Sequence, residues 1–319
     1  MAYQTGDVIL DDHYNGFVND NSPNNINKIW GTGSADYGYG QSTTISSVTA
    51  GSTVAATQWN TLLDRMQSIK NHQGSSISSS AGTLAGGDPI SAILTISTDI
   101  TTLGTNRLNV SGGNVTLSNA VTGTRTFTGT WSVATVHEVS FTFASVDAAR
   151  YFFNAGGTLR WDGSINSYTT DDKTLDWENL LETRFGTFSF GATSSSLSGN
   201  GTISTNNATT GYYDLVGTGY NTIFKMFGGQ TSYTVYNTNY IQIDVKTDGS
   251  TGSNSGNGYI ITIKATMQDD AADEVNDPTL DTIDGNLVSN WGYYKPNQTY
   301  LNNDAVGTIT TAEVSQSQS

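Results

Sequence analysis

The chain has 319 residues, only 13% of them charged, and its net charge at pH 7 is −15. Its 13 lysines and arginines are scattered singly, which excludes the clustered cations that nucleic-acid binding requires. The absence of cysteine from the sequence excludes disulfides and thiolate metal sites, and no apolar run approaches the roughly 20 residues of a membrane-spanning helix.

Residues 1–56 are predicted to be irregular, because the Asn-rich stretch 19–25 and the Tyr-Gly repeat 37–40 show no hydrophobic period. A segment of this kind cannot form a core of its own. Phe17 and Trp30 nevertheless lie within it. We therefore interpret 1–56 as a docking segment that packs on a neighbouring subunit.

Residues 57–108 are predicted to be a helical segment with a Ser/Gly-rich link. Apolar residues at helical spacing follow Thr57, a plausible cap, and Gly74 closes this helix. The link covers 75–87, and a second helix is expected over 88–103, with a strand as the alternative because of its threonines. The stripe of the first helix packs either in a core or between subunits. With the two aromatic residues above, the docking candidates are Phe17, Trp30, Trp59, Leu62, Leu63, Met66 and Ile69.

The stretch 145–157, Ser-Val-Asp-Ala-Ala-Arg-Tyr-Phe-Phe-Asn-Ala-Gly-Gly, predicts a short helix between two strands. Ser145 is a suitable N-cap, and Gly156 tolerates the positive φ that ends a helix. Phe141 and Phe143 alternate before it, and the alternation resumes after it. The same pattern also suits a helix–strand corner in any globular protein.

Residues 109–290 are predicted to be a β-rich body, with short helices near 146–153 and 171–184. The strongest hairpin signal joins the alternating runs 240–245 and 259–265 through a Gly/Ser/Asn loop. Residues 291–319 are interpreted as a C-terminal tail. The predicted fold class is α+β, mainly β, with an antiparallel, sandwich-like body preceded by an irregular segment and one or two short helices.

An acidic loop follows the second strand of that hairpin and ends at Asp284-Gly285. Carboxylates at this density are ligands that suit Ca²⁺, but their spacing does not match the twelve-residue calcium loop. A solvated loop without a cofactor is the expectation, with Ca²⁺ as the alternative. The candidate metal ligands are Asp269, Asp270, Asp273, Glu274 and Asp277.

No catalytic constellation is recognisable, and we expect no enzymatic activity and no catalytic residues. The three histidines, His13, His72 and His137, each stand alone in the sequence, and there is no Gly-x-Ser-x-Gly elbow. Tyrosines offer the one alternative, because flat aromatic faces can stack on sugar rings; cross-strand packing is the other reading. They are Tyr212, Tyr213, Tyr220, Tyr233, Tyr236 and Tyr240.

Three stretches, 2–18, 57–74 and 145–157, resemble structural proteins of tailed-phage virions, particularly those of marine cyanophages. The resemblance implies a homo-oligomeric virion component of the tail, neck, baseplate or fibre apparatus, with other virion proteins as partners. A host-surface polysaccharide-binding or depolymerising tail protein is the alternative, with a surface glycan as its partner. Since the amino terminus shows no secretory pattern, we expect assembly in the host cytoplasm and release by lysis.

Overall fold

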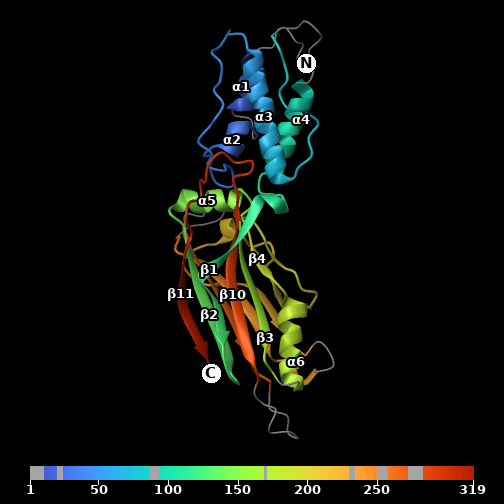
Figure 1. The fold of residues 1–319 in the computed structure, drawn as a ribbon, viewed down its shortest axis with the longest axis vertical. Helices are drawn as coiled ribbons and strands as arrows, with labels where there is room; N and C mark the ends of the chain where they lie inside the picture. Colours follow the sequence, from blue (N-terminus) through green and yellow to red (C-terminus); the bar gives the residue numbers. More distant parts are fainter. Residues whose placement is uncertain are drawn as a thin grey trace. The chain divides into compact units, whose positions relative to one another are not determined.

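The computed structural model describes residues 11–19, 24–86, 93–168, 171–229, 234–249, 258–271 and 283–319. They belong to two compact units, drawn in Figure 1. Unit 1 comprises Met1–Thr116, Arg150–Gly157 and Lys295–Gly307; unit 2 comprises Leu117–Ala149, Thr158–Tyr294 and Thr308–Ser319. The chain passes between the units five times, so neither unit is a continuous segment.

Unit 1 is helical, and its helices surround one apolar core. Helix α3 is the longest of them and ends at Gly74, whose φ of 71° is the left-handed conformation expected of a glycine stop. The expected cap Thr57 lies inside α3; instead, the backbone N–H of Ala55 donates to Gln58 Oε1 at 2.8 Å. The described helices are α1 (Asp11–Val18), α2 (Ile26–Trp30), α3 (Ala56–Gln73), α4 (Ile93–Thr105) and η1 (Gly112–Asn114).

Segment 1–56 was predicted to be irregular, but it contains α1 and α2, and it contributes to the core of unit 1 together with α3 and α4. Its described polar residues are ordered by amide side chains that bond both backbone groups of one distant residue. Asn27 bonds Ile45 in this way at 2.8 and 2.7 Å, and Asn15 bonds Val48 at 2.8 and 3.0 Å. Each amide supplies the two hydrogen bonds that a residue on a neighbouring strand would make. The backbone N–H and C=O groups of an extended segment are therefore hydrogen-bonded without such a strand.

The Ser/Gly-rich link is held to its flanking helices in the same manner. Asn60 bonds both backbone groups of Leu84 at 2.9 Å, and Asp99 accepts the backbone N–H groups of Ser78 and Ser79 at 3.1 and 2.7 Å. Gly82 lies so close to α3 that an added Cβ would be 2.3 Å from the Asn60 backbone. Side chains on α3 and α4 thus fix a segment that composition alone reads as a flexible linker.

Helix α5 (Val146–Asn154) forms as predicted. The Ala148 N–H donates to Ser145 Oγ at 3.1 Å, and Gly156, with φ 82°, follows the helix end. Its first residues belong to unit 2, and those from Arg150 onward belong to unit 1. The predicted corner is confirmed, and it is also a place where the chain changes unit.

Unit 2 is built from two antiparallel sheets, which confirms a mainly β, α+β fold. One sheet has the strand order β1-β10-β3-β4-β5 and the other β11-β2-β9-β8-β7-β6. The predicted hairpin is β8–β9, with Ile243 opposite Ala265; most of its loop lies outside the described residues. The strands are β1 (Val115–Phe127), β2 (Ala134–Thr142), β3 (Thr158–Asn166), β4 (Phe188–Phe190), β5 (Ser195–Leu197), β6 (Thr205–Asn206), β7 (Asn221–Phe227), β8 (Tyr240–Thr247), β9 (Ile260–Gln268), β10 (Asn286–Pro296) and β11 (Thr310–Gln318).

The two sheets pack face to face through aromatic side chains. Phe141 of β2 meets Tyr293 of β10 with ring centroids 6.3 Å apart, and Phe188 of β4 meets Phe224 of β7 at 6.1 Å. Both contacts are edge-to-face, the geometry that aromatic pairs prefer. The predicted helix near 171–184 is α6 (Asp172–Glu178), continued by a π-helical turn, η2 (Asn179–Phe185); η3 (Tyr212–Asp214) and η4 (Thr234–Tyr236) are short turns.

The predicted C-terminal tail is not a separate tail, which corrects the proposed division of the chain. Strand β10 runs to Pro296, residues 295–307 belong to unit 1, and β11 is an end strand of the six-stranded sheet. Within residues 295–307, Asn297 N–H donates to Asn114 O at 2.8 Å. The tail is therefore divided between both units.

Candidate functional site

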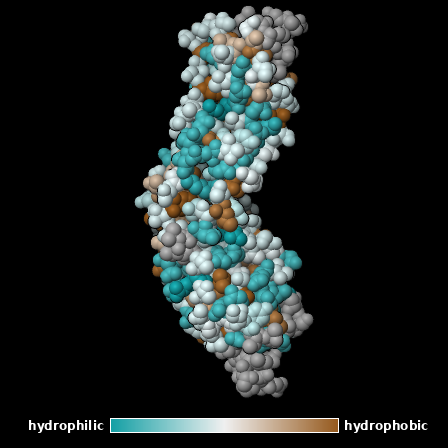
Figure 2. Space-filling model, viewed as in Figure 1, coloured by the Kyte–Doolittle hydropathy of each residue, from teal (hydrophilic) through white to brown (hydrophobic). Residues whose placement is uncertain are grey.

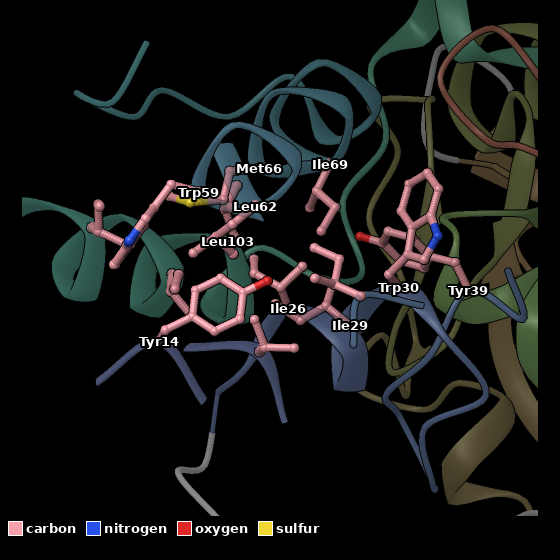
Figure 3. Close-up of a cluster of buried hydrophobic side chains, with 14 of the residues drawn as sticks. Tyr14, Ile26, Ile29, Trp30, Tyr39, Trp59, Leu62, Met66, Ile69 and Leu103 are labelled. Carbon is pink, nitrogen blue, oxygen red and sulfur yellow. The ribbon is translucent and has the colours of Figure 1, made fainter. Parts of the chain in front are cut away.

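The predicted docking residues lie in the core of unit 1 (Figure 3). Five of the seven have no exposed surface, while Phe17 and Leu63 are partly buried against the same cluster. Trp59 makes edge-to-face contacts with Tyr14 at 5.5 Å and with Phe17 at 6.2 Å. A buried side chain is not available to a partner, so these residues stabilise the single chain. The five fully buried residues are Trp30, Trp59, Leu62, Met66 and Ile69.

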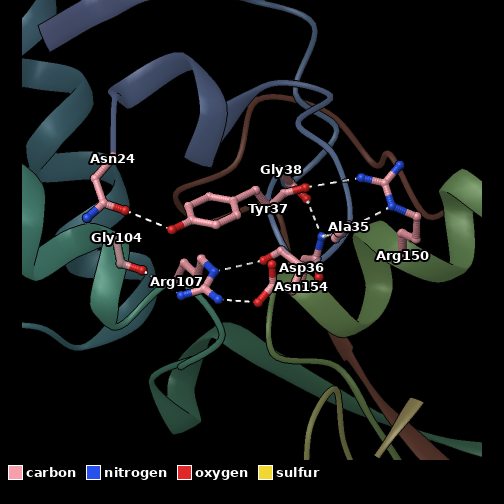
Figure 4. A network of polar contacts seen from close by, with 9 residues as sticks. All are labelled: Asn24, Ala35, Asp36, Tyr37, Gly38, Gly104, Arg107, Arg150 and Asn154. Carbon is pink, nitrogen blue, oxygen red and sulfur yellow. Dashed lines mark hydrogen bonds and ion pairs between the residues drawn. The ribbon is translucent and has the colours of Figure 1, made fainter. Parts of the chain in front are cut away.

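A polar network fixes the loop around Tyr37 (Figure 4). The Tyr37 ring lies 4.2 Å from the Arg107 guanidinium, and Arg107 also forms an ion pair with Asp36. From α5, Arg150 Nε and Asn154 Nδ2 each donate to Ala35 O at 3.1 Å. The charged and amide groups of α5 therefore satisfy backbone carbonyls within unit 1, and their role in the structure is to hold this loop.

The acidic loop supplies an ion pair where a metal ligand was considered. Asp269 Oδ2 lies 2.6 Å from Lys173 Nζ, and both side chains are 2% exposed or less. Burial raises the pKa of Asp269 to about 6, against the opposing effect of Lys173. Asp270 accepts from Gln268 Nε2 at 2.9 Å on the surface. The lysine ammonium thus occupies the place beside Asp269 that a cation would take.

The other metal candidates, Asp273, Glu274 and Asp277, lie outside the described residues. Among the residues that the structure does describe, no three His, Asp or Glu side chains are grouped closely enough to hold a metal ion. Within the same ranges, no helix is both long and apolar enough to cross a bilayer.

A serine, a histidine and a glutamate come together between the two sheets, which the sequence did not indicate. Ser289 Oγ of β10 lies 2.9 Å from His137 Nδ1 of β2, and His137 Nε2 lies 4.0 Å from Glu313 Oε2 of β11. Trp161 Nε1 donates to the same hydroxyl at 2.8 Å.

This group cannot act as a nucleophilic triad, although its residue types are those of one. Ser289 and His137 have no exposed surface. A substrate carbonyl must come within hydrogen-bond distance of the nucleophile, and the packed sheets leave no room for it. The group instead satisfies polar atoms inside an apolar sandwich. Only its spatial arrangement would have revealed it, since its members are far apart in sequence.

The tyrosines considered for sugar stacking are mostly internal. Tyr212, Tyr213 and Tyr236 are buried, and Tyr233 lies outside the described residues. Tyr220 and Tyr240 are more exposed, but lysine ammonium groups lie over their rings. Lys225 Nζ is 3.5 Å from the Tyr240 centroid, and Lys246 and Lys264 Nζ are each 4.3 Å from the Tyr220 centroid. These cation–π contacts occupy ring faces that a sugar would need.

Of the four described strands that end a sheet in unit 2, β1 and β11 are long, while β5 and β6 have only three and two residues. Strand β1 ends the five-stranded sheet and β11 ends the six-stranded one. Phe127 of β1 meets His137 of β2, the strand next to β11, at 6.2 Å, so both edges lie on one side of the sandwich. Neither strand contains a lysine or a proline; of the other features that protect an edge, β1 has Arg125, and β11 has Glu313 and the register shift between Glu313 and Ser315.

The surface of the molecule in the view of Figure 2 is largely polar, with apolar residues in small separate patches. All six tryptophans are 2% exposed or less. A contiguous apolar patch of the kind that marks an obligate interface is therefore not visible on this face. Comparison with family models, with curated proteins and with solved structures finds no match to this chain.

Proposed function

We propose that this protein is a structural component of a tailed-phage virion, in the tail, neck, baseplate or fibre apparatus, and that it acts by homo-oligomeric assembly rather than by catalysis. The observation that carries the proposal is the pair of long, open strand edges, β1 and β11, on one side of the sandwich. An unpaired edge is a template on which another strand adds by backbone hydrogen bonding.

The sequence resemblance supports the choice of particle. Residues 2–18, 57–74 and 145–157 resemble virion structural proteins. Within 145–157, the side chains of Arg150 and Asn154 donate hydrogen bonds to a backbone carbonyl of the same chain. Such a protein associates with copies of itself and with other virion proteins. It assembles in the host cytoplasm, becomes part of the particle, and leaves the cell by lysis.

Purified particles of the phage that encodes this chain provide the test. Mass spectrometry should find its peptides in particles purified by density gradient, and antibodies against it should label the tail or neck under electron microscopy. Peptides present in infected cells but absent from gradient-purified particles would contradict the proposal.

Polysaccharide binding or cleavage is the alternative, and it has less support. Tyr220, which is exposed, and Tyr240, which is half-buried, have lysines over the rings that could stack on a sugar. Depletion of a host polysaccharide by the purified chain, lost in Tyr240→Ala, would favour this alternative over a purely structural role.

A further inference from the structure

Strand β11 contributes almost nothing apolar to the core of unit 2. Its sequence is Thr-Thr-Ala-Glu-Val-Ser-Gln-Ser-Gln, and Val314, its one large apolar residue, is 51% exposed. Residues opposite each other on paired strands share a face. Thr311, Glu313 and Gln316 face the side of Phe141, Val139 and His137 respectively, so the inward face of β11 is polar.

The strand is therefore held chiefly by polar bonds. It pairs with β2 from Thr310 to Gln318, and Ser315 Oγ donates to Glu138 Oε2 at 2.7 Å. Beyond the strand, Ser319 O accepts from Val133 N–H at 3.0 Å. Because these bonds join backbone and short polar groups, they re-form without loss on an identical strand from a second copy, and detachment exposes little apolar surface.

The short segment before β11 contains features that let the direction of the backbone change ahead of the strand. Gly307 has φ 67°, and no atom lies within 4 Å of the position that a Cβ would take. The Lys295 Nζ group lies 2.6 Å from Asp304 Oδ2 and donates to Gly307 O at 2.5 Å, and the Gly307 N–H donates to Asp304 Oδ1 at 3.0 Å, so the chain is fixed up to and including this glycine. Only Thr308 and Ile309 separate this fixed segment from the strand, so a change of backbone direction at these two residues redirects β11 as a whole.

We propose that β11 is exchanged between copies, so that in the assembled protein the edge of β2 in one copy is covered by β11 of another. This inference rests on the proposed homo-oligomeric function, and it identifies β11 on β2 as the contact between two copies. A second copy is the occupant because the edge of β2 already accepts this strand in a defined register, including the shift between Glu313 and Ser315. A strand of other sequence would have to reproduce that irregularity, which makes the site selective.

Because the chain lacks cysteine, engineered disulfides report the pairing directly. Ser140 and Ala312 are opposite each other on β2 and β11. Co-expressed Ser140→Cys and Ala312→Cys chains carry one thiol each and can form this disulfide only between copies. The expected result is a covalent heterodimer of two 33.9 kDa chains on a non-reducing gel.

In a matched control, a chain with Thr266→Cys is co-expressed with the Ala312→Cys chain, in place of the Ser140→Cys chain. Thr266 lies on β9, opposite Val136 of β2, and is therefore one strand further from β11. This pair should give no heterodimer. Gly307→Ala disfavours the turn of the unexchanged chain through its positive φ without a steric clash, so it should raise the share of the covalent heterodimer.

The double variant Ser140→Cys/Ala312→Cys separates the outcomes. An oligomer by light scattering in which every disulfide is intramolecular would overturn strand exchange and leave the assembly proposal standing. A monomer with an intramolecular disulfide would overturn both. A fall in the heterodimer share in Gly307→Ala would also count against exchange.

Discussion

Amide side chains order the polar segments of unit 1 because each offers one donor and one acceptor in the geometry of a peptide group. Asn27 is the clearest case, since it bonds both backbone groups of Ile45 and is only 8% exposed. In Asn27→Asp the group that faces the Ile45 carbonyl becomes an acceptor. We expect a loss of about 1–3 kcal/mol in the free energy of unfolding, measured by urea titration.

The control for this change is Asn109→Asp, at an exposed position in the same unit. It should alter the free energy of unfolding by no more than about 0.5 kcal/mol. Equal effects of the two substitutions would show that the paired amide is not a stabilising element.

His72 makes unit 1 sensitive to acid. Its Nε2 donates to Ala155 O at 3.0 Å, and burial lowers the pKa of His72 to about 4. In the unfolded chain a histidine has a pKa of about 6.5, so between pH 6.5 and 4 the unfolded state binds a proton that the native state does not. The contribution of His72 to the free energy of unfolding should therefore fall as pH drops through this range, by about 3 kcal/mol in total, while the raised pKa of Asp269 acts in the opposite direction.

Urea unfolding at intervals between pH 7.5 and 4.5 measures this loss. In His72→Gln the stability is lower at neutral pH, but the slope between pH 6.5 and 4.5 should be shallower than in the wild type. Identical slopes would mean that another group carries the acid sensitivity.

Removing either partner of the buried ion pair of Lys173 and Asp269 should lower the free energy of unfolding. Lys173→Met leaves a buried carboxylate without its ammonium, and we expect a loss of about 3–5 kcal/mol. The double variant Lys173→Met/Asp269→Leu should recover much of that loss. The exposed pair of Lys295 and Asp304 is the control, since Lys295→Met should cost about 1 kcal/mol or less. Thermal unfolding of all three variants would reveal whether burial makes the difference.

At the scale of elements, α3 supplies the largest share of apolar side chains to the core of unit 1. Trp59→Ala should lower the free energy of unfolding by about 3–5 kcal/mol, and Leu63→Ala, which is only partly buried, by less. Circular dichroism during heating measures both. Loss of assembly in Trp59→Ala with an unchanged melting temperature would restore the docking interpretation that burial now argues against.

Elements with a strong local signal were predictable from the sequence. The helical stripe and glycine stop of α3, the cap and glycine of α5, and the alternation of β8 and β9 are all short-range patterns, and all three predictions are confirmed. Strand β11 was not predicted, because its polar side chains show no alternation; backbone pairing with β2 forms it instead. The available signal for a strand at Thr310–Gln318 was its content of threonine and valine together with the absence of lysine and proline.

At the scale of the whole molecule, the division into units depends on contacts between residues far apart in sequence. Gln41 Oε1 accepts the backbone N–H groups of Asn302 and Asn303 at 2.7 and 2.9 Å, across more than 250 residues. No local pattern marks such a pairing, so the sequence suggested a separate tail. The buried group of Ser289 and His137 escaped prediction for the same reason.

The chain buries its tryptophans within its own units and has β1 and β11 as end strands of its sheets, and the central proposal is assembly through backbone pairing. Multi-angle light scattering of the purified chain of 319 residues over a range of concentrations tests this most directly. The account predicts one defined multiple of 33.9 kDa that persists in high salt, because backbone hydrogen bonds are not screened as surface ion pairs are. A molar mass of 33.9 kDa at every concentration would contradict it.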